Sequence, residues 1–598
     1  MTTPGRAGNG APFHEAGDNS EALRVDRVKT FMKGEKPIAT RDLRLSVILS
    51  FANGLLIIAQ AFLIASAVTA VAIDGAVLDA VLPSLLLLLP LFLARAVLIY
   101  FAEQASFRAG AAVKRDLRAR ALDHLRRAGP VALAEQPTGR LVTALTDSLA
   151  AIEPYYSRYL PTASLVTLLP LAVLVAVVPS DWLSAVVLVV TAPLIPLFMV
   201  LIGGGAERMN QRQWQKLARM SGHLIDVIQG LTTLKIFNAS RREAAEVARM
   251  AEDYRRDTMA VLRLAFLSSL ALEFFATVSI AIVAVFIGFR LLWGEMAFFN
   301  GFFVLLLAPE FYLPLRTLGT AYHARMEAIG AAERVTELFD IPVPARPAEG
   351  TTLADGGRID ISFEDVGVVF ADGRVGLDGF SLTVAAGERI ALVGPSGAGK
   401  STVLNLLLGF VAPTSGRIRV NGTPLDDIDL ADWRQHIAHL SQHPHLFHAD
   451  LAENIAMTDG VLDEARLETA TEAAFAREIV AALPDGFSTR LGERGFGLSG
   501  GEIQRIGLAR AFYRDAPLVL MDEATAHLDR DSEQKVSAAI DRLATGRTLI
   551  AIAHRLETAR DADRIVLMEE GRVAATGRPG DFAGDPRLAG LIAEEVAE

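Results

Sequence analysis

The chain has 598 residues and no cysteine, which excludes disulfides, thiolate metal sites and covalent thiol chemistry by this chain. Its formal net charge of −11 disfavours nucleic acid as a partner, because duplex binding requires a basic surface. Hydrophobic residues make up 51% of the chain and the mean hydropathy is +0.34, which is high for a soluble enzyme. The first residues are polar and lack the apolar core of a cleavable signal peptide, so we expect residues 1–20 to form a disordered tail.

Six apolar runs follow, each close to or above the roughly 20 residues that a membrane-spanning helix needs. They cover 46–73, 76–101, 159–178, 182–204, 264–289 and 291–315. The alternative, buried helices of a soluble core, is disfavoured by the number and length of the runs. The sequence therefore predicts an all-α transmembrane domain with six helices over residues 21–340.

Lys and Arg residues predict the orientation of these helices, since cytoplasmic loops carry the excess of positive charge. They are frequent before the first run and in the long stretches 102–158 and 205–263, whereas the links near 74 and at 179–181 have none. Both termini and both long stretches are therefore expected in the cytoplasm. The helical spacing of the long stretches predicts that they continue the membrane helices and turn back, with each turn pressing a short helix onto another domain.

A strand-like run, "RIALVG" at 389–394, leads into the glycine-rich loop "GPSGAGKST" and then into a helix-like run. This strand–loop–helix context is the one that a phosphate-binding P-loop requires. Backbone N–H groups would face the phosphates, Lys400 would add a positive charge, and the Ser401 hydroxyl would reach Mg²⁺. The predicted ATP-binding residues of this loop are Gly394, Ser396, Gly397, Ala398, Gly399, Lys400, Ser401 and Thr402.

Two further apolar strands end in residues suited to phosphate chemistry. The run "PLVLMDEATAHLD" at 517–529 delivers Asp522, a candidate Mg²⁺ ligand, and then Glu523, a candidate for orienting the attacking water. The run 548–554 ends in His554. A lone histidine is more often structural, but beside the other two it is a candidate sensor of the γ-phosphate.

Between these strands lies "LSGGEIQRIGLARA" at 498–511. Together with the P-loop, this set resembles the ATP-binding cassette of ABC transporters over the whole soluble half. The resemblance implies that Ser499, Gly500 and Gly501 form the signature loop, which contacts the γ-phosphate of ATP held by the opposite subunit. It also implies roles for the residues that match the family's other loops: Gln442 (link to the membrane domain, Mg²⁺ and catalysis), Phe370 (adenine stacking), Asp529 (D-loop) and Glu493 (cross-domain loop of exporters). For Phe370, an ordinary strand residue of the core is the alternative.

The sequence departs from the family pattern at two places. The signature usually ends in Gln and here ends in Glu502, and the D-loop usually reads SALD and here reads AHLD. A carboxylate at position 502 would add negative charge near the nucleotide that this loop completes. We expect it to weaken that composite site, whereas Glu523 leaves the site on this chain's own P-loop competent to hydrolyse ATP.

The resemblance implies a half-transporter of the exporter type. Its fold class is a membrane all-α six-helix domain (21–340) joined by a linker (341–357) to an α/β P-loop NTPase cassette (358–598). One cassette carries a P-loop at one edge and a signature at the other, so two cassettes must meet head to tail to complete an ATP site. ATP and Mg²⁺ are the expected cofactors, and the lipid bilayer and a second half-transporter are the expected partners.

The sequence of the membrane half resembles one particular family of ABC exporters. The segments 53–65, 191–199, 263–275 and 307–325 resemble the CydD family, whose members pair with CydC in the bacterial inner membrane. That resemblance implies a heterodimer linked to cytochrome bd assembly, with a small anionic cargo that is cysteine and glutathione or, alternatively, haem. Two other interpretations stay open: a homodimeric exporter of lipid, drug or peptide, and an ATPase whose membrane part only anchors or senses.

Three charged residues lie within apolar runs: Arg95, Glu273 and Glu310. Ionisable groups are costly there and tend to face a cavity or a partner. They are candidates either for pairing with one another or for lining a cargo path. Arg95 has a further alternative, which is to reach the cytoplasmic headgroups with its long side chain. No histidine lies mid-membrane, so an axial haem ligand would come from the partner or from His323.

Overall fold

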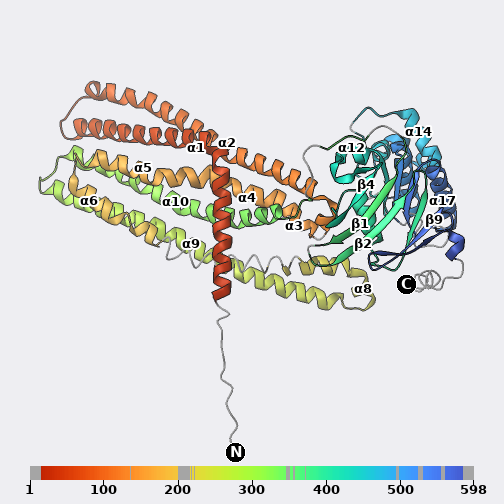
Figure 1. Ribbon diagram of the computed structural model, residues 1–598. Coiled ribbons are helices and arrows are strands. Elements are labelled where there is room, and N and C mark those ends of the chain that lie inside the picture. Colours follow the sequence, from red (N-terminus) through yellow and green to blue (C-terminus); the bar gives the residue numbers. More distant parts are fainter. Residues whose placement is uncertain are drawn as a thin grey trace, which may run out of the picture. The chain divides into compact units, whose positions relative to one another are not determined.

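The computed structural model describes residues 15–134, 136–198, 216, 219–220, 222–344, 350–353, 357–370, 372–458, 460–492, 497–522, 529–553 and 559–582 (Figure 1). Contacts divide the chain into two compact units. The membrane unit comprises Met1–Leu125 and Gln136–Ile341, and the cassette unit comprises Arg126–Glu135 and Pro342–Glu598.

Every described secondary-structure element of the membrane unit is a helix. Its elements are α1 (Glu15–Ala72), α2 (Leu78–Ala134, whose last residues belong to the cassette unit), α3 (Thr138–Thr143), α4 (Leu149–Pro154), α5 (Leu160–Val177), α6 (Trp182–Thr191), α8 (Leu231–Ile236), α9 (Ser240–Leu292) and α10 (Phe298–Phe339). Two π-helical turns, Ala144–Ser148 and Tyr155–Tyr159, join α3, α4 and α5. The helices extend far beyond the apolar runs: α1 has 58 residues, α2 has 57 and α9 has 53, against about 20 for a membrane crossing.

Among the described residues, five helices are long and apolar enough to cross a membrane. They belong to α1, α2, the α3–α5 stretch, α9 and α10. The expected fourth crossing at 182–204 is described only as a shorter apolar helix, Trp182–Phe198, and its remaining residues lie outside the described part of the chain.

The membrane unit has two clusters of buried side chains. One lies among the apolar runs, where α10 residues such as Leu307 and Tyr312 pack against α1, α5, α6 and α9. The other joins the N-terminal part of α1 to α2, α4 and the end of α10. Figure 1 shows this N-terminal part (dark red) crossing the long helices. It is fixed there by the Tyr156 hydroxyl, which donates to the Met32 carbonyl at 2.7 Å, and by Glu35, which pairs with Arg120 at 2.8 Å.

The cassette unit holds two β-sheets (Figure 1). An antiparallel sheet has the order β2 (Val375–Val384), β1 (Ile361–Val369), β4 (Ser415–Val420) and β5 (Thr423–Pro424). The larger sheet has the order β10 (Arg572–Gly577), β9 (Arg564–Glu569), β3 (Arg389–Val393), β8 (Thr548–Ile552), β7 (Leu518–Asp522) and β6 (Ile437–Leu440). All its neighbours are parallel except β10 and β9. The described helices longer than one short turn are α11 (Lys400–Leu407), α12 (Leu430–Gln435), α13 (Leu451–Ala456), α14 (Glu464–Ala473), α15 (Arg477–Ala482), α16 (Gly500–Arg514) and α17 (Arg530–Ala544).

The central strands β3, β7 and β8 are buried along almost their whole length, which explains why they appear in the sequence as unbroken apolar runs. Their register places the carboxyl ends level: Leu392 lies opposite Ile552, and Ile552 lies opposite Asp522. Parallel α/β sheets bind ligands beyond this edge. The sheet therefore positions the loops after β3, β7 and β6 beside one another.

A buried threonine ties the two sheets together. Thr548, at the start of β8, is 1% exposed, and its hydroxyl donates to the Ile359 carbonyl at 2.8 Å. The same oxygen accepts from the Gly387 amide at 2.9 Å. One side chain thus satisfies two backbone groups, one just before β1 and one in the turn before β3.

We predict that Thr548→Val destabilises the cassette. Valine keeps the shape but leaves both backbone groups without a partner, at a cost of about 1–3 kcal/mol. The measurement is the urea midpoint followed by the emission of Trp433, the one tryptophan in 342–598, with the chain's other tryptophans changed to phenylalanine. Thr469→Val, at an exposed helix position, is the control. Equal midpoints for the two variants would contradict the prediction.

Candidate functional site

The glycine-rich loop after β3 has a backbone that only glycine can adopt. A Cβ at Gly399 (φ 99°) would lie 2.5 Å from the Gly376 carbonyl oxygen, and one at Gly394 would lie 2.2 Å from the Met568 oxygen. The loop is thereby held between the start of β2 and the end of β9. Ser396 and Gly397 form its exposed tip, whereas Ala398 is buried.

The loop leads directly into the N-terminus of α11, where free backbone N–H groups and the helix dipole favour an anion. Lys400 is 6% exposed, and its ammonium donates to the carbonyls of Gly394 at 2.5 Å and Pro395 at 3.0 Å. Ser401 is exposed beside it and Thr402 is buried. A strained loop, a buried cation and an exposed hydroxyl at one helix start fit the phosphates of a nucleotide and a Mg²⁺ ion.

Phe370 lies next to this helix. A Cβ on Gly376 would lie 2.7 Å from the Phe370 ring and 3.2 Å from the Thr402 methyl group, so the ring reaches the P-loop helix across that glycine. The ring is partly buried against the larger hydrophobic core of the cassette. This burial is also what we expect if Phe370 is an ordinary strand residue of the core. The guanidinium of Arg374, which the sequence interpretation did not single out, lies 4.7 Å from the ring centre.

Two more predicted residues share the carboxyl edge of the sheet. Asp522 ends β7 and is half-buried. Gln442 follows β6, whose Leu440 pairs with Met521 of β7. The Gln442 carbonyl accepts from the side-chain amide of Gln504 on α16, a link that the sequence interpretation missed. Glu523, His554 and Glu493 lie outside the described residues.

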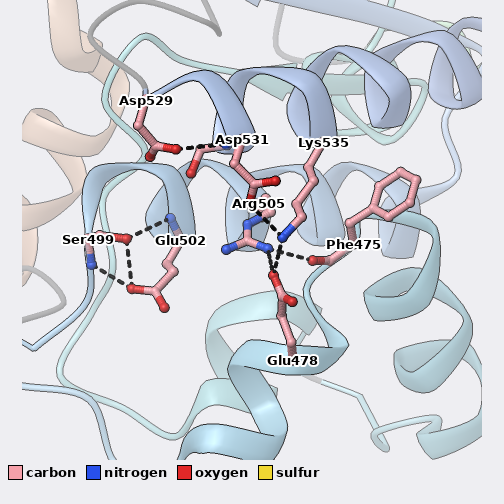
Figure 2. Close-up of polar contacts among 9 residues, drawn as sticks. Phe475, Glu478, Ser499, Glu502, Arg505, Asp529, Asp531 and Lys535 are labelled. Atoms are coloured by element: carbon pink, nitrogen blue, oxygen red, sulfur yellow. Dashed lines mark hydrogen bonds and ion pairs between the residues drawn. The ribbon is translucent and has the colours of Figure 1, made fainter.

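The signature loop forms the capped start of α16 (Figure 2). The Glu502 amide donates to the Ser499 hydroxyl, and the Glu502 carboxylate accepts from the Ser499 amide at 2.7 Å and from its hydroxyl at 2.8 Å. This reciprocal pair is a capping box, and Gln is the other residue that completes one. Gly500 and Gly501 occupy the first turn. Glu502 therefore has a structural role that the sequence expectation, based on charge alone, did not include.

An ion-pair network joins the signature helix to its neighbours (Figure 2). Arg505 of α16 is largely buried, donates to the Phe475 carbonyl at 3.0 Å and pairs with Glu478 of α15. Lys535 of α17 pairs with the same carboxylate at 2.9 Å and also with Asp531. Lys535 and Arg505 together hold the pKa of Glu478 below its ordinary value.

Asp529, the predicted D-loop residue, caps α17. Its carboxylate accepts from the Ser532 amide at 3.0 Å, and hydrogen bonds from Ser532 lower the pKa of Asp529 below its ordinary value. The network around Glu478 thus connects a helix that begins at the signature with a helix that begins at the D-loop.

The three membrane charges do not pair with one another. Glu273 of α9 pairs with Arg316 of α10. Arg95 of α2 donates to the side-chain oxygens of Asn53 and Gln60 on α1. Glu310 of α10 has one carboxylate oxygen that is buried without a hydrogen bond. His323 is exposed on α10.

Comparison with known families matches both halves of the chain. The profile described as the ABC transporter transmembrane region matches residues 43–310, and the profile described as ABC transporter matches 377–526. CydD of Escherichia coli, named as an ATP-binding/permease protein of a glutathione/L-cysteine transport system, is 38% identical over 96% of this chain and 99% of its own. CydC of Bacillus subtilis, with the same transport description, is 34% identical over 91% of this chain and 94% of its own.

A solved structure, a bacterial Atm1-family ABC exporter with ATP bound, superposes with a TM-score of 0.75 at 26% identity and covers 94% of this chain and 98% of its own. The helical membrane domain and the α/β cassette are therefore the exporter fold. With relatives of this identity across nearly the full length, the chain belongs to the ABC transporter family, as an exporter-type half-transporter whose cassette is an ATPase coupled to transport.

Proposed function

We propose that the chain is the CydD-type half of a heterodimer that uses ATP to move cysteine or glutathione out of the bacterial cytoplasm. The observation that carries this proposal is the 38% identity to a glutathione/L-cysteine transport protein over 96% of the chain. The second half would be CydC-like. The complex would lie in the inner membrane with both termini and the cassette in the cytoplasm, and it would support cytochrome bd assembly.

In this proposal the chain's own P-loop binds one ATP. The loop amides and Lys400 balance the charge of the phosphates, and Phe370 stacks on the adenine. Ser401, Gln442 and Asp522 would hold Mg²⁺, which when bound neutralises charge that develops on the phosphates. Glu523 orients the attacking water, and His554 contacts the γ-phosphate. Ser499, Gly500 and Gly501 complete the site on the partner's P-loop, with Asp529 beside it.

The cassette unit also contains a segment that can pass its movement to the membrane helices. Arg126–Glu135, the end of α2, belongs to this unit, and a Cβ at Gly129 would lie 3.9 Å from the Phe410 ring. Arg434 stacks on the same ring at 5.0 Å. Because α2 is one helix as far as its kink at Gly129, we propose that this segment transmits cassette motion to the cargo path.

Cysteine and glutathione are the proposed cargo because the similar proteins are described as glutathione/L-cysteine transporters, a description that does not include haem. The alternative is a homodimeric exporter of lipid, drug or peptide. It would have the same cassette motifs, so a transport experiment must distinguish it from the proposed heterodimer.

The proposal predicts that the chain, co-expressed with a CydC-like half-transporter and reconstituted in liposomes, takes up cysteine or glutathione when ATP is supplied on the cassette side. Thiol-dependent stimulation of the ATPase is the second readout. A homodimer that hydrolyses ATP at full rate and ignores both thiols would instead support the alternative.

We predict that Glu523→Gln stops ATP turnover at the P-loop site of this chain while ATP stays bound. The amide keeps the shape of the side chain but loses the charge that orients water. The measurements are phosphate release and retained radiolabelled ATP in the assembled complex. Asp541→Asn, at an exposed cassette position, is the control. Turnover close to wild type would show that hydrolysis occurs at the other composite site.

We predict that Glu502→Gln leaves the protein folded and keeps or raises its ATPase rate. Glutamine can still complete the capping box with Ser499, and the substitution removes a negative charge near the nucleotide held by the partner. Glu502→Ala, which removes the carboxylate half of the box, should cost about 0.5–1.5 kcal/mol of stability, the contribution of a typical hydrogen bond. The two variants are compared by melting temperature and ATPase rate. A large fall in rate for the glutamine variant would reveal a further role of the carboxylate.

A further inference from the structure

We propose that Arg95 and Glu310 form a binding site for the zwitterionic end of an amino-acid thiol, in which Arg95 takes the α-carboxylate and Glu310 the α-ammonium. The inference rests on the proposed function and adds the chemistry by which the cargo would be recognised. It predicts selection for molecules that carry both charges on one carbon.

Arg95 is held in place without being neutralised. Its Nε donates to Asn53 Oδ1 at 3.2 Å, and its Nη1 donates to Gln60 Oε1. Asn53 and Gln60 are seven residues apart, so they lie on one face of α1. Both partners are neutral amides and therefore leave the positive charge of the guanidinium available. A guanidinium has five N–H donors, so donors remain for a carboxylate.

This geometry disfavours the interpretation in which Arg95 reaches for headgroups. Its side chain is half-buried and turned toward α1, whereas its neighbours Leu93 and Val97 on α2 are exposed. Two fixed hydrogen bonds to another helix hold the guanidinium at the depth of Asn53 and Gln60.

Glu310 is the complementary group. It follows Pro309 within the apolar run of α10, and its Oε2 is buried with no hydrogen-bond partner. A buried polar atom without a partner is rare in folded proteins and costs free energy, more so for a carboxylate in a membrane. In the proposed site, this oxygen accepts a hydrogen bond from the ammonium of the cargo.

The two charges meet at the same stretch of α1. Arg95 donates to Gln60, and the next residue, Ala61, lies in one buried cluster with Leu307 and Phe311, which flank Glu310 on α10. The two described side chains form no ion pair with each other. A cation with spare donors and an anion with a free oxygen, both next to the same stretch of α1, complement an amino acid. Cysteine and the γ-glutamyl end of glutathione each present an α-carboxylate and an α-ammonium. A cargo with only anionic groups would be repelled by Glu310 when that carboxylate is ionised.

The test uses the assembled complex in liposomes and measures the concentration that half-stimulates ATPase activity. The probes are cysteine, N-acetylcysteine, which lacks the ammonium, and cysteamine, which lacks the carboxylate. We expect wild type to require at least about tenfold more of either analogue than of cysteine, as the loss of one charged hydrogen bond would produce. Glu310→Gln should lose the preference over N-acetylcysteine, and Arg95→Gln the preference over cysteamine.

Two controls keep the outcome clear. Glu103→Gln, at an exposed position of α2, should keep both preferences and the basal ATPase rate. Arg95→Lys, which keeps the charge, should retain the preference over cysteamine, and this protects the test if Arg95→Gln does not fold. Unchanged preferences in the Arg95 and Glu310 variants would overturn the site while leaving the proposed function intact. A wild-type complex that responds to no thiol would instead overturn the proposed function.

Discussion

The arrangement of this protein depends on one constraint: the donors that a nucleotide's phosphates require are divided between two separately packed parts of the cassette. The P-loop follows β3, packs with the main core and shares a sheet edge with Asp522 and Gln442. Ser499 starts α16, whose buried side chains belong to a second core with α13, α14 and α17. In the exporter family each cassette thus completes its partner's site, and we infer that ATP acts here as the clamp between two half-transporters.

Side-chain contacts connect these elements. Gln504 joins the signature helix to the Gln442 carbonyl, and Glu478 joins Arg505 to Lys535. A change at the sheet edge can therefore reach the signature and the D-loop helix through direct contacts. The capping box between Ser499 and Glu502 stabilises the first turn of α16 through hydrogen bonds within that turn.

Local patterns allowed much of this to be predicted from the sequence. The P-loop glycines, the apolar central strands and the long apolar helices each depend on neighbours within a few residues, and the exporter fold they indicated is confirmed. The capping box was also visible as Ser-x-x-Glu at 499–502, although the sequence expectation considered only the charge of Glu502. The contacts of the membrane charges were not predictable, because their partners lie 35 to 43 residues away on other helices. Pairing of Glu273 with Arg316 and of Arg95 with two amides depends on how helices pack, which no local pattern encodes.

We infer that this chain works as one of two different halves joined by ATP. The most direct measurement is native mass spectrometry of the Glu523→Gln complex, purified through this chain from cells that also express the second half-transporter, with ATP and Mg²⁺ present. We predict one copy of this chain, one copy of the other half-transporter and two bound nucleotides. A complex of two copies of this chain, or a single chain that retains ATP alone, would contradict it.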